Sequence, residues 1–141
     1  MIVIIPCGSK KSNEPTLIKN LYKGGYFKWC KKWAESVTSK EKIYILSAKY
    51  GFINYLYQKK ISPYEVTFNN KINCIAQNIL NKQAIYFNIK KAFVLGGKNY
   101  IDRCKLAIDD INSIQELYPE KRWGIGYQMQ FLKNNLGKQL W

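Results

Sequence analysis

The sequence predicts a single α/β domain of three layers, with a mainly parallel sheet between helices on both faces. Three short apolar runs, at residues 2–6, 42–48 and 92–95, each lead through small residues into a helix or a long loop. Runs without polar alternation are typical of strands buried on both faces, and strands that alternate with helices form parallel sheets. Because 141 residues suffice for one sizeable core, we expect residues 1–141 to form one domain.

The first half of the chain supplies two of these strands and one clear helix. Strand 2–6 is followed by a helical stretch that begins near Pro15. After two glycines, apolar side chains recur with helical spacing. This spacing predicts a helix whose inward face carries Phe27, Cys30, Ala34 and Val37. Strand 42–48 then leads into an aromatic loop at residues 49–68, whose length of about 20 residues is typical of loops that carry function or contain extra short elements.

The second half continues the alternation. Helices are predicted over residues 70–86 and 100–111, on either side of strand 92–95. A short strand or loop around residues 114–118 precedes a last helix that follows the glycines near residue 125. The inward faces of these three helices are predicted to carry Ile72, Ile75, Ala76, Ile79 and Leu80, then Ile101, Cys104, Ile108 and Ile111, and finally Met129, Leu132 and Leu136.

The carboxyl ends of the three strands are expected to meet at one edge of the sheet, which is where open α/β sheets bind ligands. The loops at residues 6–11, 47–51 and 96–100 then converge there. Turn chemistry explains any one of these loops, but three polar, glycine-bearing loops at one edge indicate a site. The predicted cleft is lined by Cys7, Ser9, Lys10, Ser47, Lys49 and Gly97, with Tyr50 or Tyr64 at its rim.

The first of these loops suits an anion such as phosphate. Gly8 allows close approach of the backbone, Ser9 and the backbone N–H groups donate hydrogen bonds, and Lys10 and Lys11 add positive charge. The loop is not a P-loop, because GxxxxGK[ST] is absent. The alternative is an ordinary turn between strand and helix with solvated lysines.

The charge balance predicts nucleic acid or a nucleotide as the partner. The chain carries 23 basic and nine acidic residues, a net charge of +14. Only Arg103 and Arg122 are arginines, and lysine acts on phosphate as a point charge rather than as a bidentate reader of base edges. Part of the lysine content can reflect a genome of biased base composition.

The chain contains no histidine, which excludes Ser-His-Asp and Cys-His catalysis within it, and also histidine zinc sites. Its four cysteines form no CxxC pair, so neither a zinc ribbon nor a thioredoxin-type redox motif is present. We expect neither a metal nor any other cofactor. Cys30, Cys74 and Cys104 fall on or beside apolar helix stripes and are expected to be buried thiols. Cys7 differs, because neighbouring lysines favour its thiolate and make it a candidate nucleophile.

The sequence predicts a cytoplasmic protein without membrane contact. No apolar run approaches the roughly 20 residues of a membrane span, and Met1 leads directly into the first strand. The oligomeric state is left open.

Five segments together resemble a small bacterial and phage domain of unknown function. They are Pro6-Cys7-Gly8-Ser9-Lys10-Lys11, Leu21-Tyr22-x-Gly24 with Phe27, Leu46-Ser47-Ala48-Lys49-Tyr50-Gly51, Pro63-Tyr64, and Gly124-Ile125-Gly126 followed by Leu132. The resemblance covers nearly the whole chain. That domain is distantly similar to the proline-cysteine-serine loop domain of archaeosine synthases and to base-processing domains of uracil-DNA-glycosylase type. This similarity implies nucleobase recognition and an N-glycosylase acting on DNA bases, including modified ones.

An enzyme that breaks a base–sugar bond needs a carboxylate near the sugar and donors aimed at the departing base. Glu65 and Asp102 are the acidic residues closest to the predicted edge, and they join Cys7 as candidate catalytic residues. For both, the alternative is a solvated surface acid or a charge at a helix N-terminus. The candidate substrate-binding residues are Gly8, Ser9, Lys10, Lys11, Ser47, Lys49, Tyr50, Tyr64 and Gly97.

Two other classes of function stay open. The lysines and tyrosines suit a protein that binds DNA or RNA without changing it, and such binding is sensitive to salt. They also suit a phage-type protein that binds and sequesters a free nucleotide, which would raise its melting temperature.

Overall fold

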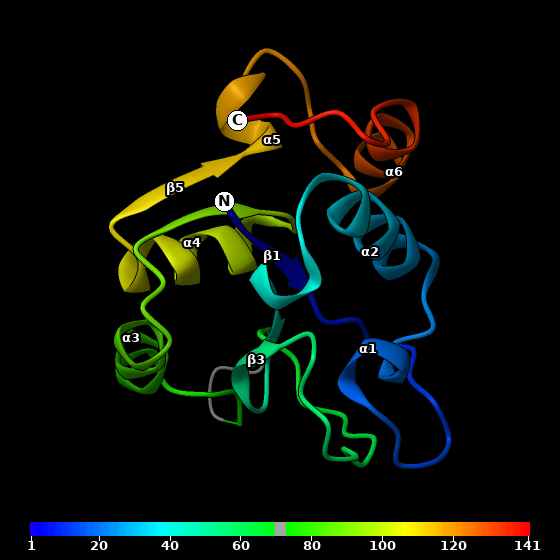
Figure 1. Ribbon diagram of the computed structural model, residues 1–141, viewed down its shortest axis with the longest axis vertical. Coiled ribbons are helices and arrows are strands. Elements are labelled where there is room, and N and C mark those ends of the chain that lie inside the picture. Colours follow the sequence, from blue (N-terminus) through cyan, green and yellow to red (C-terminus); the bar gives the residue numbers. More distant parts are fainter. Residues whose placement is uncertain (70–72) are drawn as a thin grey trace.

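The central strand of the fold is β1 (Ile2–Pro6), and four further strands extend the sheet on both sides of it (Figure 1). The order is β3-β2-β1-β4-β5, with β2 at Ile43–Ser47, β3 at Gly51–Asn54, β4 at Lys91–Val94 and β5 at Asp110–Ser113. Strands β2 and β4 are parallel to β1, β5 is parallel to β4, and β3 is antiparallel to β2. The three predicted strands are therefore parallel neighbours. The computed structural model describes residues 1–69 and 73–141.

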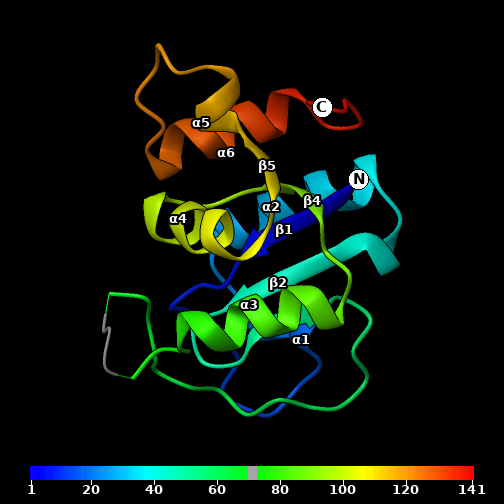
Figure 2. The same ribbon diagram turned by 90° about the vertical axis from the view of Figure 1, so that its left-hand side faces the viewer.

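Helices cover both faces of the sheet. They are α1 (Ile18–Leu21), α2 (Gly25–Val37), α3 (Gln77–Tyr86), α4 (Lys98–Ala107), α5 (Ile114–Leu117) and α6 (Ile125–Asn134), with a short 3-10 turn η1 at Lys40–Lys42. In Figure 1, α3 and α4 lie to the left of the central strands and α1, α2 and α6 to the right. Seen from that left-hand side, α3 and α4 lie in front (Figure 2). The predicted three-layer α/β arrangement is confirmed. None of the helices in the described ranges is long and apolar enough to cross a lipid bilayer.

Two hydrophobic cores lie on opposite faces of the sheet, because side chains along β1 alternate between them. Val3 and Ile5 face a core that contains Trp33 of α2, whereas Ile4 faces a core that contains Leu80 of α3. The three β1 side chains have no solvent-accessible surface. Burial on both faces explains why this strand is an uninterrupted apolar run. The predicted inward residues of α2 are all buried: Phe27, Cys30, Ala34 and Val37.

The aromatic loop predicted over residues 49–68 contains an extra short element, as expected. The chain turns back after β2 and forms β3, which pairs antiparallel with it. Gly51 begins this strand with a φ of +79°, a conformation that residues with a side chain rarely adopt. Farther along, Ile61 forms an isolated antiparallel bridge with Thr16. The loop is thus tied to the segment before α1.

The helix predicted over residues 70–86 begins later than predicted. Ile72 lies outside the described residues, and residues 73–76 are not helical. The N–H of Ile75 donates to the carbonyl of Ala48 at 2.7 Å, in the turn after β2. This tertiary contact takes the place of a helical hydrogen bond, so apolar periodicity alone placed the start of α3 too early.

Three residues predicted to face inward are exposed. Ala76 is exposed and lies just before α3. Ile79 on α3 is 46% exposed, because the packed face of this short helix runs through Leu80 and Ala84. Leu136 follows the end of α6 and is also exposed, although Leu132 is buried as predicted.

The segment after α4 also differs from the prediction. The helix predicted to reach residue 111 ends at Ala107. At the start of β5, the backbone N–H of Asp110 donates to the carbonyl of Lys90. Ile111 is therefore a half-buried strand residue. Where a strand or loop was predicted at residues 114–118, α5 forms, because the Ser113 hydroxyl accepts a hydrogen bond from the N–H of Glu116 and caps it.

Candidate functional site

The candidate site lies where the strand order changes direction. From β1 the chain proceeds to β2 on one side and later to β4 on the other, so the carboxyl ends of β1 and β4 flank the switch point. Ligand sites of open α/β sheets form at this position. The backbone ladder continues past the strand ends, since Cys7 donates to the carbonyl of Leu46 and Leu95 to that of Ile4.

Cys7 and Tyr100 form a reciprocal contact across the switch point. The Tyr100 hydroxyl donates to the carbonyl oxygen of Cys7 at 3.1 Å and lies 3.1 Å from its Sγ. Because the carbonyl accepts the single hydroxyl hydrogen, the thiol is the donor in the second contact. Gly96 permits this approach. Its φ is +137°, a conformation that residues with a side chain rarely adopt. A Cβ at this position would lie 3.0 Å from the Tyr100 Cβ and 3.4 Å from the Pro6 Cβ.

Three hydroxyl groups form a buried chain beside this contact. The Tyr64 hydroxyl bonds both the Ser47 hydroxyl, at 2.6 Å, and the Tyr22 hydroxyl. Ser47 also accepts hydrogen bonds from the backbone N–H groups of Lys49 and Tyr50, which fixes the turn after β2. Burial raises the pKa of Tyr22 and Tyr64 well above the usual tyrosine value, and the charge of a Cys7 thiolate would raise both further. Both tyrosines are therefore neutral phenols.

Two lysine ammonium groups lie over this cluster. The Nζ of Lys11 is 4.5 Å from the ring centroid of Tyr64 and 5.8 Å from that of Tyr22. The Nζ of Lys49 is 5.2 Å from the Tyr50 ring centroid and 6.0 Å from that of Tyr64. In the described part of the chain, the ion-paired lysines are Lys91, Lys98 and Lys105, so the two ammonium groups here stay available for an anion.

Partial burial lowers the pKa of Lys11 below the ordinary lysine value. Attraction from Cys7 and from the Glu65 carboxylate opposes this shift in part. The backbone of Lys11 is held by an antiparallel bridge to Tyr22, which carries the lysine from the exposed loop back over the tyrosines. Desolvation disfavours the charged ammonium and is the largest of these effects, so the pKa of Lys11 stays below the ordinary lysine value.

The remaining residues of the predicted cleft are spread more widely. Ser9 and Lys10 are exposed on the loop after β1, and no atom lies within 4 Å of where a Cβ on Gly8 would be. Gly97 precedes α4 and lines a hollow with Gln115 and Trp123, whereas Tyr50 lines a separate groove beside β3. The contacts of the cluster itself join Lys11, Ser47, Lys49, Tyr50 and Tyr64, and Cys7 acts electrostatically on Lys11 and Tyr64.

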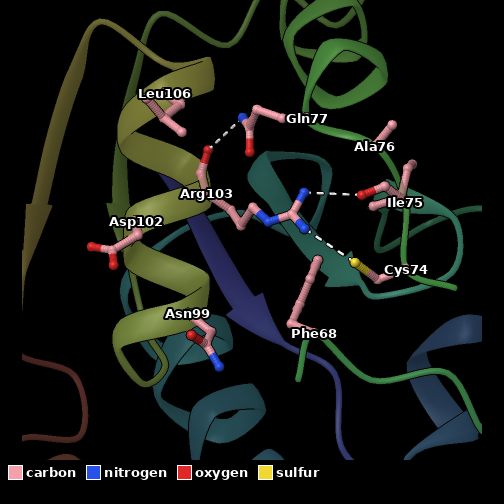
Figure 3. A pocket seen from close by; sticks show the side chains of 9 residues that line it. All are labelled: Phe68, Cys74, Ile75, Ala76, Gln77, Asn99, Asp102, Arg103 and Leu106. Atoms are coloured by element: carbon pink, nitrogen blue, oxygen red, sulfur yellow. Dashed lines mark hydrogen bonds between the residues drawn. The ribbon is translucent and has the colours of Figure 1, made fainter. Parts of the chain in front are cut away.

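The two candidate carboxylates have different surroundings. Glu65 directly follows buried Tyr64, is exposed, and acts electrostatically on Lys11. Asp102 lies two residues beyond Tyr100 on α4, about 200° around the helix axis, and therefore points away from Cys7. Its carboxylate pairs with Lys98 at 3.4 Å in an exposed i,i+4 contact. Figure 3 shows the Asp102 side chain turned outward from α4.

A buried glutamine braces the loop after β4. Gln128 of α6 is 1% exposed, donates to the carbonyls of Trp123 and Gly96 at 2.9 and 3.4 Å, and accepts from the Tyr26 hydroxyl. Gln115 donates to the same Gly96 carbonyl at 2.8 Å. Sequence reasoning missed the glutamines and tyrosines 22, 26 and 100. Two signals pointed to some of them, since the loop expected at this edge ends at Tyr100 and the segments of the resemblance include Tyr22.

A second hollow, of about 490 Å³, lies between α4 and the segment before α3 (Figure 3). Its central cation is already engaged, because the Arg103 guanidinium donates to the Ile75 carbonyl at 2.9 Å and to Cys74 Sγ at 3.1 Å, 5.2 Å from the Phe68 ring centroid. Gln77 in turn donates to the carbonyl of Arg103 at 3.0 Å. We therefore assign Arg103 a structural role.

The cysteines are all free thiols. Cys30 and Cys104 are buried as predicted, whereas Cys74 is partly buried and, like Ile75, precedes α3. Over residues 1–69 and 73–141, no group of three or more His, Cys, Asp or Glu side chains is arranged to hold a metal ion.

The fold and the cluster define a doubly wound α/β domain with lysines and buried tyrosines at its switch point. The chain belongs to a family of unknown function (DUF6884), which it matches over residues 2–134. No curated protein and no solved structure matches the chain.

Proposed function

We propose that this protein recognises a base in a nucleic acid, with the base held at the tyrosine cluster and its phosphates at the lysines. One observation carries the proposal: Lys11 and Lys49 both approach the ring of Tyr64, whose hydroxyl is bonded to Ser47 and Tyr22. Cations for phosphate thus stand beside hydroxyl groups that donate and accept hydrogen bonds at a base edge.

Neutral phenols suit a base because they both donate and accept. The raised pKa of Tyr64 keeps its hydroxyl protonated. Tyr50, at the rim, has an accessible ring on which a base can stack. The net charge of +14 favours a polymer with many phosphates over a free nucleotide.

The reaction that fits these groups is hydrolysis of the base–sugar bond. In this step a water oxygen bonds to C1′ of the sugar, the C1′–N bond breaks, and its electron pair leaves with the base, which takes up a proton. In this proposal Glu65 stabilises the positive sugar and accepts the proton of the water, and Lys11 protonates the departing base. The electrostatic effect of Glu65 on Lys11 and the lowered pKa of Lys11 support these roles. We assign these roles to Glu65 rather than to Asp102, which is paired with Lys98.

Abasic-site formation tests the reaction directly. Modified and unmodified DNA are incubated with the protein and with two variants, Glu65→Gln and Asp102→Asn. We expect Glu65→Gln to abolish product while binding persists, since the carboxylate acts mainly on the transition state. Asp102→Asn is the matched control and should retain activity. Loss of activity in Asp102→Asn alone would contradict our assignment of the carboxylate.

Salt-dependent binding tests base recognition separately from the reaction. Lys11→Ala and Lys49→Ala should weaken binding to all sequences, each reducing the slope of log K against log salt by about 1. Lys42→Ala, an exposed lysine in η1 at the opposite edge of the sheet, is the control and should affect binding less. Binding without product would establish a non-catalytic protein, and stabilisation by nucleotides but not by DNA would establish a nucleotide-sequestering one. Binding that is unchanged in both site variants would refute the proposal.

A further inference from the structure

We infer that the groove beside β3 binds the single-stranded segment of nucleic acid that flanks the recognised base. The inference rests on the proposed function, because the groove begins at the same tyrosine that forms the rim of the site. It adds a second binding surface and a preference for unpaired strands.

The groove has a volume of about 640 Å³, and half of the residues that line it are aromatic. Tyr50, Tyr57 and Tyr86 are 39%, 43% and 83% exposed, so their rings are accessible to a ligand. Phe87 and Phe52 complete the aromatic wall. Exposed aromatic rings gathered in one groove are unusual on a protein surface and mark an interaction site.

The groove adjoins the candidate site, because Tyr50 belongs to both. The Tyr50 ring packs edge-on against Tyr64, with ring centroids 5.6 Å apart, and Lys49 lies over the Tyr50 ring. A strand whose base occupies the tyrosine cluster therefore passes Tyr50 as it enters the groove. Tyr57 and Tyr86 then offer further rings for neighbouring bases.

A single side chain holds the two walls of the groove together. The Oε1 of Gln83 on α3 accepts from the N–H of Phe52 in β3, and its Nε2 donates to the carbonyl of Tyr50, both at 2.9 Å. These bonds fix α3 against β3 and leave Tyr86 and Phe87, at the end of α3, facing the loop after β3. The groove is thus preformed, which lowers the entropic cost of binding.

The chemistry of the lining favours a single strand over a duplex or an acidic peptide. Bases of a single strand expose faces that stack on aromatic rings, whereas those of a duplex are stacked on one another. Lys60 lines the groove and Lys49 stands at its beginning, and the described lining residues include no carboxylate. The aromatic rings suit the bases of one strand, and the two lysines suit its phosphates.

Binding of labelled oligonucleotides tests this inference. Fluorescence anisotropy compares single strands of about 3 and about 12 nucleotides with a duplex of the longer length. We expect the longer strand to bind more tightly than the short strand and the duplex. Tyr57→Ala and Tyr86→Ala should each weaken binding of the longer strand about tenfold, with little effect on the short one. Tyr86→Phe should retain the affinity, because the ring still stacks.

Tyr127→Ala is the matched control, since Tyr127 is 71% exposed on α6, a helix that lies across the sheet from α3 (Figure 1). Unchanged melting temperatures would show that the groove variants are folded. If Lys11→Ala and Lys49→Ala weaken binding but the groove variants do not, the inference is wrong and the proposed function stands. If neither the lysine variants nor the groove variants have an effect, both the inference and the proposed function are wrong. Equal binding of duplex and single strand, or a dimer that Tyr86→Ala dissociates in sedimentation equilibrium, would also overturn the inference.

Discussion

Replacing Gly51 by alanine should destabilise the fold strongly, because two features of the structure exclude a side chain there. Gly51 has a φ of +79°, and a Cβ at this position would lie 2.1 Å from Oε1 of Gln83 and 2.7 Å from Cδ1 of Ile75. The methyl group therefore displaces the glutamine that joins α3 to β3. The same change opens the groove between Tyr50 and Tyr86.

The magnitude follows from these two effects. Holding alanine in a left-handed conformation costs about 1–2 kcal/mol. Displacing Gln83 leaves the N–H of Phe52 without its acceptor, at a cost of about 1–3 kcal/mol. We therefore expect the free energy of unfolding to fall by about 2–5 kcal/mol. With an unfolding entropy of about 2.1 cal/mol/K per residue, this corresponds to a melting temperature lower by about 7–17 °C for a chain of this length.

Thermal and urea unfolding followed by circular dichroism measure this effect. Gly126→Ala makes the same change in α6, where no atom lies within 4 Å of the added Cβ, and should leave stability unchanged or raise it by up to about 1 kcal/mol. The two substitutions therefore have opposite expected signs or very different sizes. A Gly51→Ala protein as stable as Gly126→Ala would refute the role given to Gln83 and to the backbone at Gly51.

Three further predictions concern the site and the thiols. Tyr64→Phe should lower the free energy of unfolding by about 1–3 kcal/mol, because the buried hydroxyls of Ser47 and Tyr22 lose their hydrogen bonds to the Tyr64 hydroxyl. An unchanged urea midpoint would contradict this. Because burial lowers the pKa of Lys11, its contribution to oligonucleotide binding should be lost as pH rises through that lowered value, below the ordinary 10.5. Lys11→Arg, which stays charged, should not show this loss in an anisotropy titration, and identical pH profiles would count against the shift. In maleimide labelling followed by peptide mass spectrometry, Cys7 should react in the folded protein, whereas Cys30 and Cys104 should react only after unfolding. Burial raises the pKa of Cys104 to about 12, which keeps its thiol protonated. Labelling of Cys104 in the folded protein as fast as that of Cys7 would disprove this protection.

The central strands could be predicted because burial on both faces leaves an unmistakable apolar run, as in Ile2 to Ile5. The two edge strands could not be predicted in this way. β5 reads Asp-Ile-Asn-Ser and has one apolar residue, while β3 depends on a turn that requires a positive φ at Gly51. Edge strands bury less surface, so their sequences carry a weaker signal.

The convergence of loops at the switch point could also be predicted, since it follows from parallel strands. The strand ends brought Cys7 and Ser47 to one edge, and the aromatic loop added Tyr64. The contacts of Tyr100 and Gln128 could not be predicted, because both arise from helices far along the chain. Their placement depends on how α4 and α6 pack, which a single sequence does not reveal.

Gly96 sets a limit on how the family can vary. A residue with a Cβ at this position would meet Tyr100 at 3.0 Å in a backbone conformation that disfavours any side chain. Relatives that keep a tyrosine beside the first-strand cysteine should therefore keep glycine here, and relatives that have lost the glycine should have lost the contact as well. The presence of both Gly96 and Tyr100 offers a criterion for dividing the family into members that share this site chemistry and members that have kept only the fold.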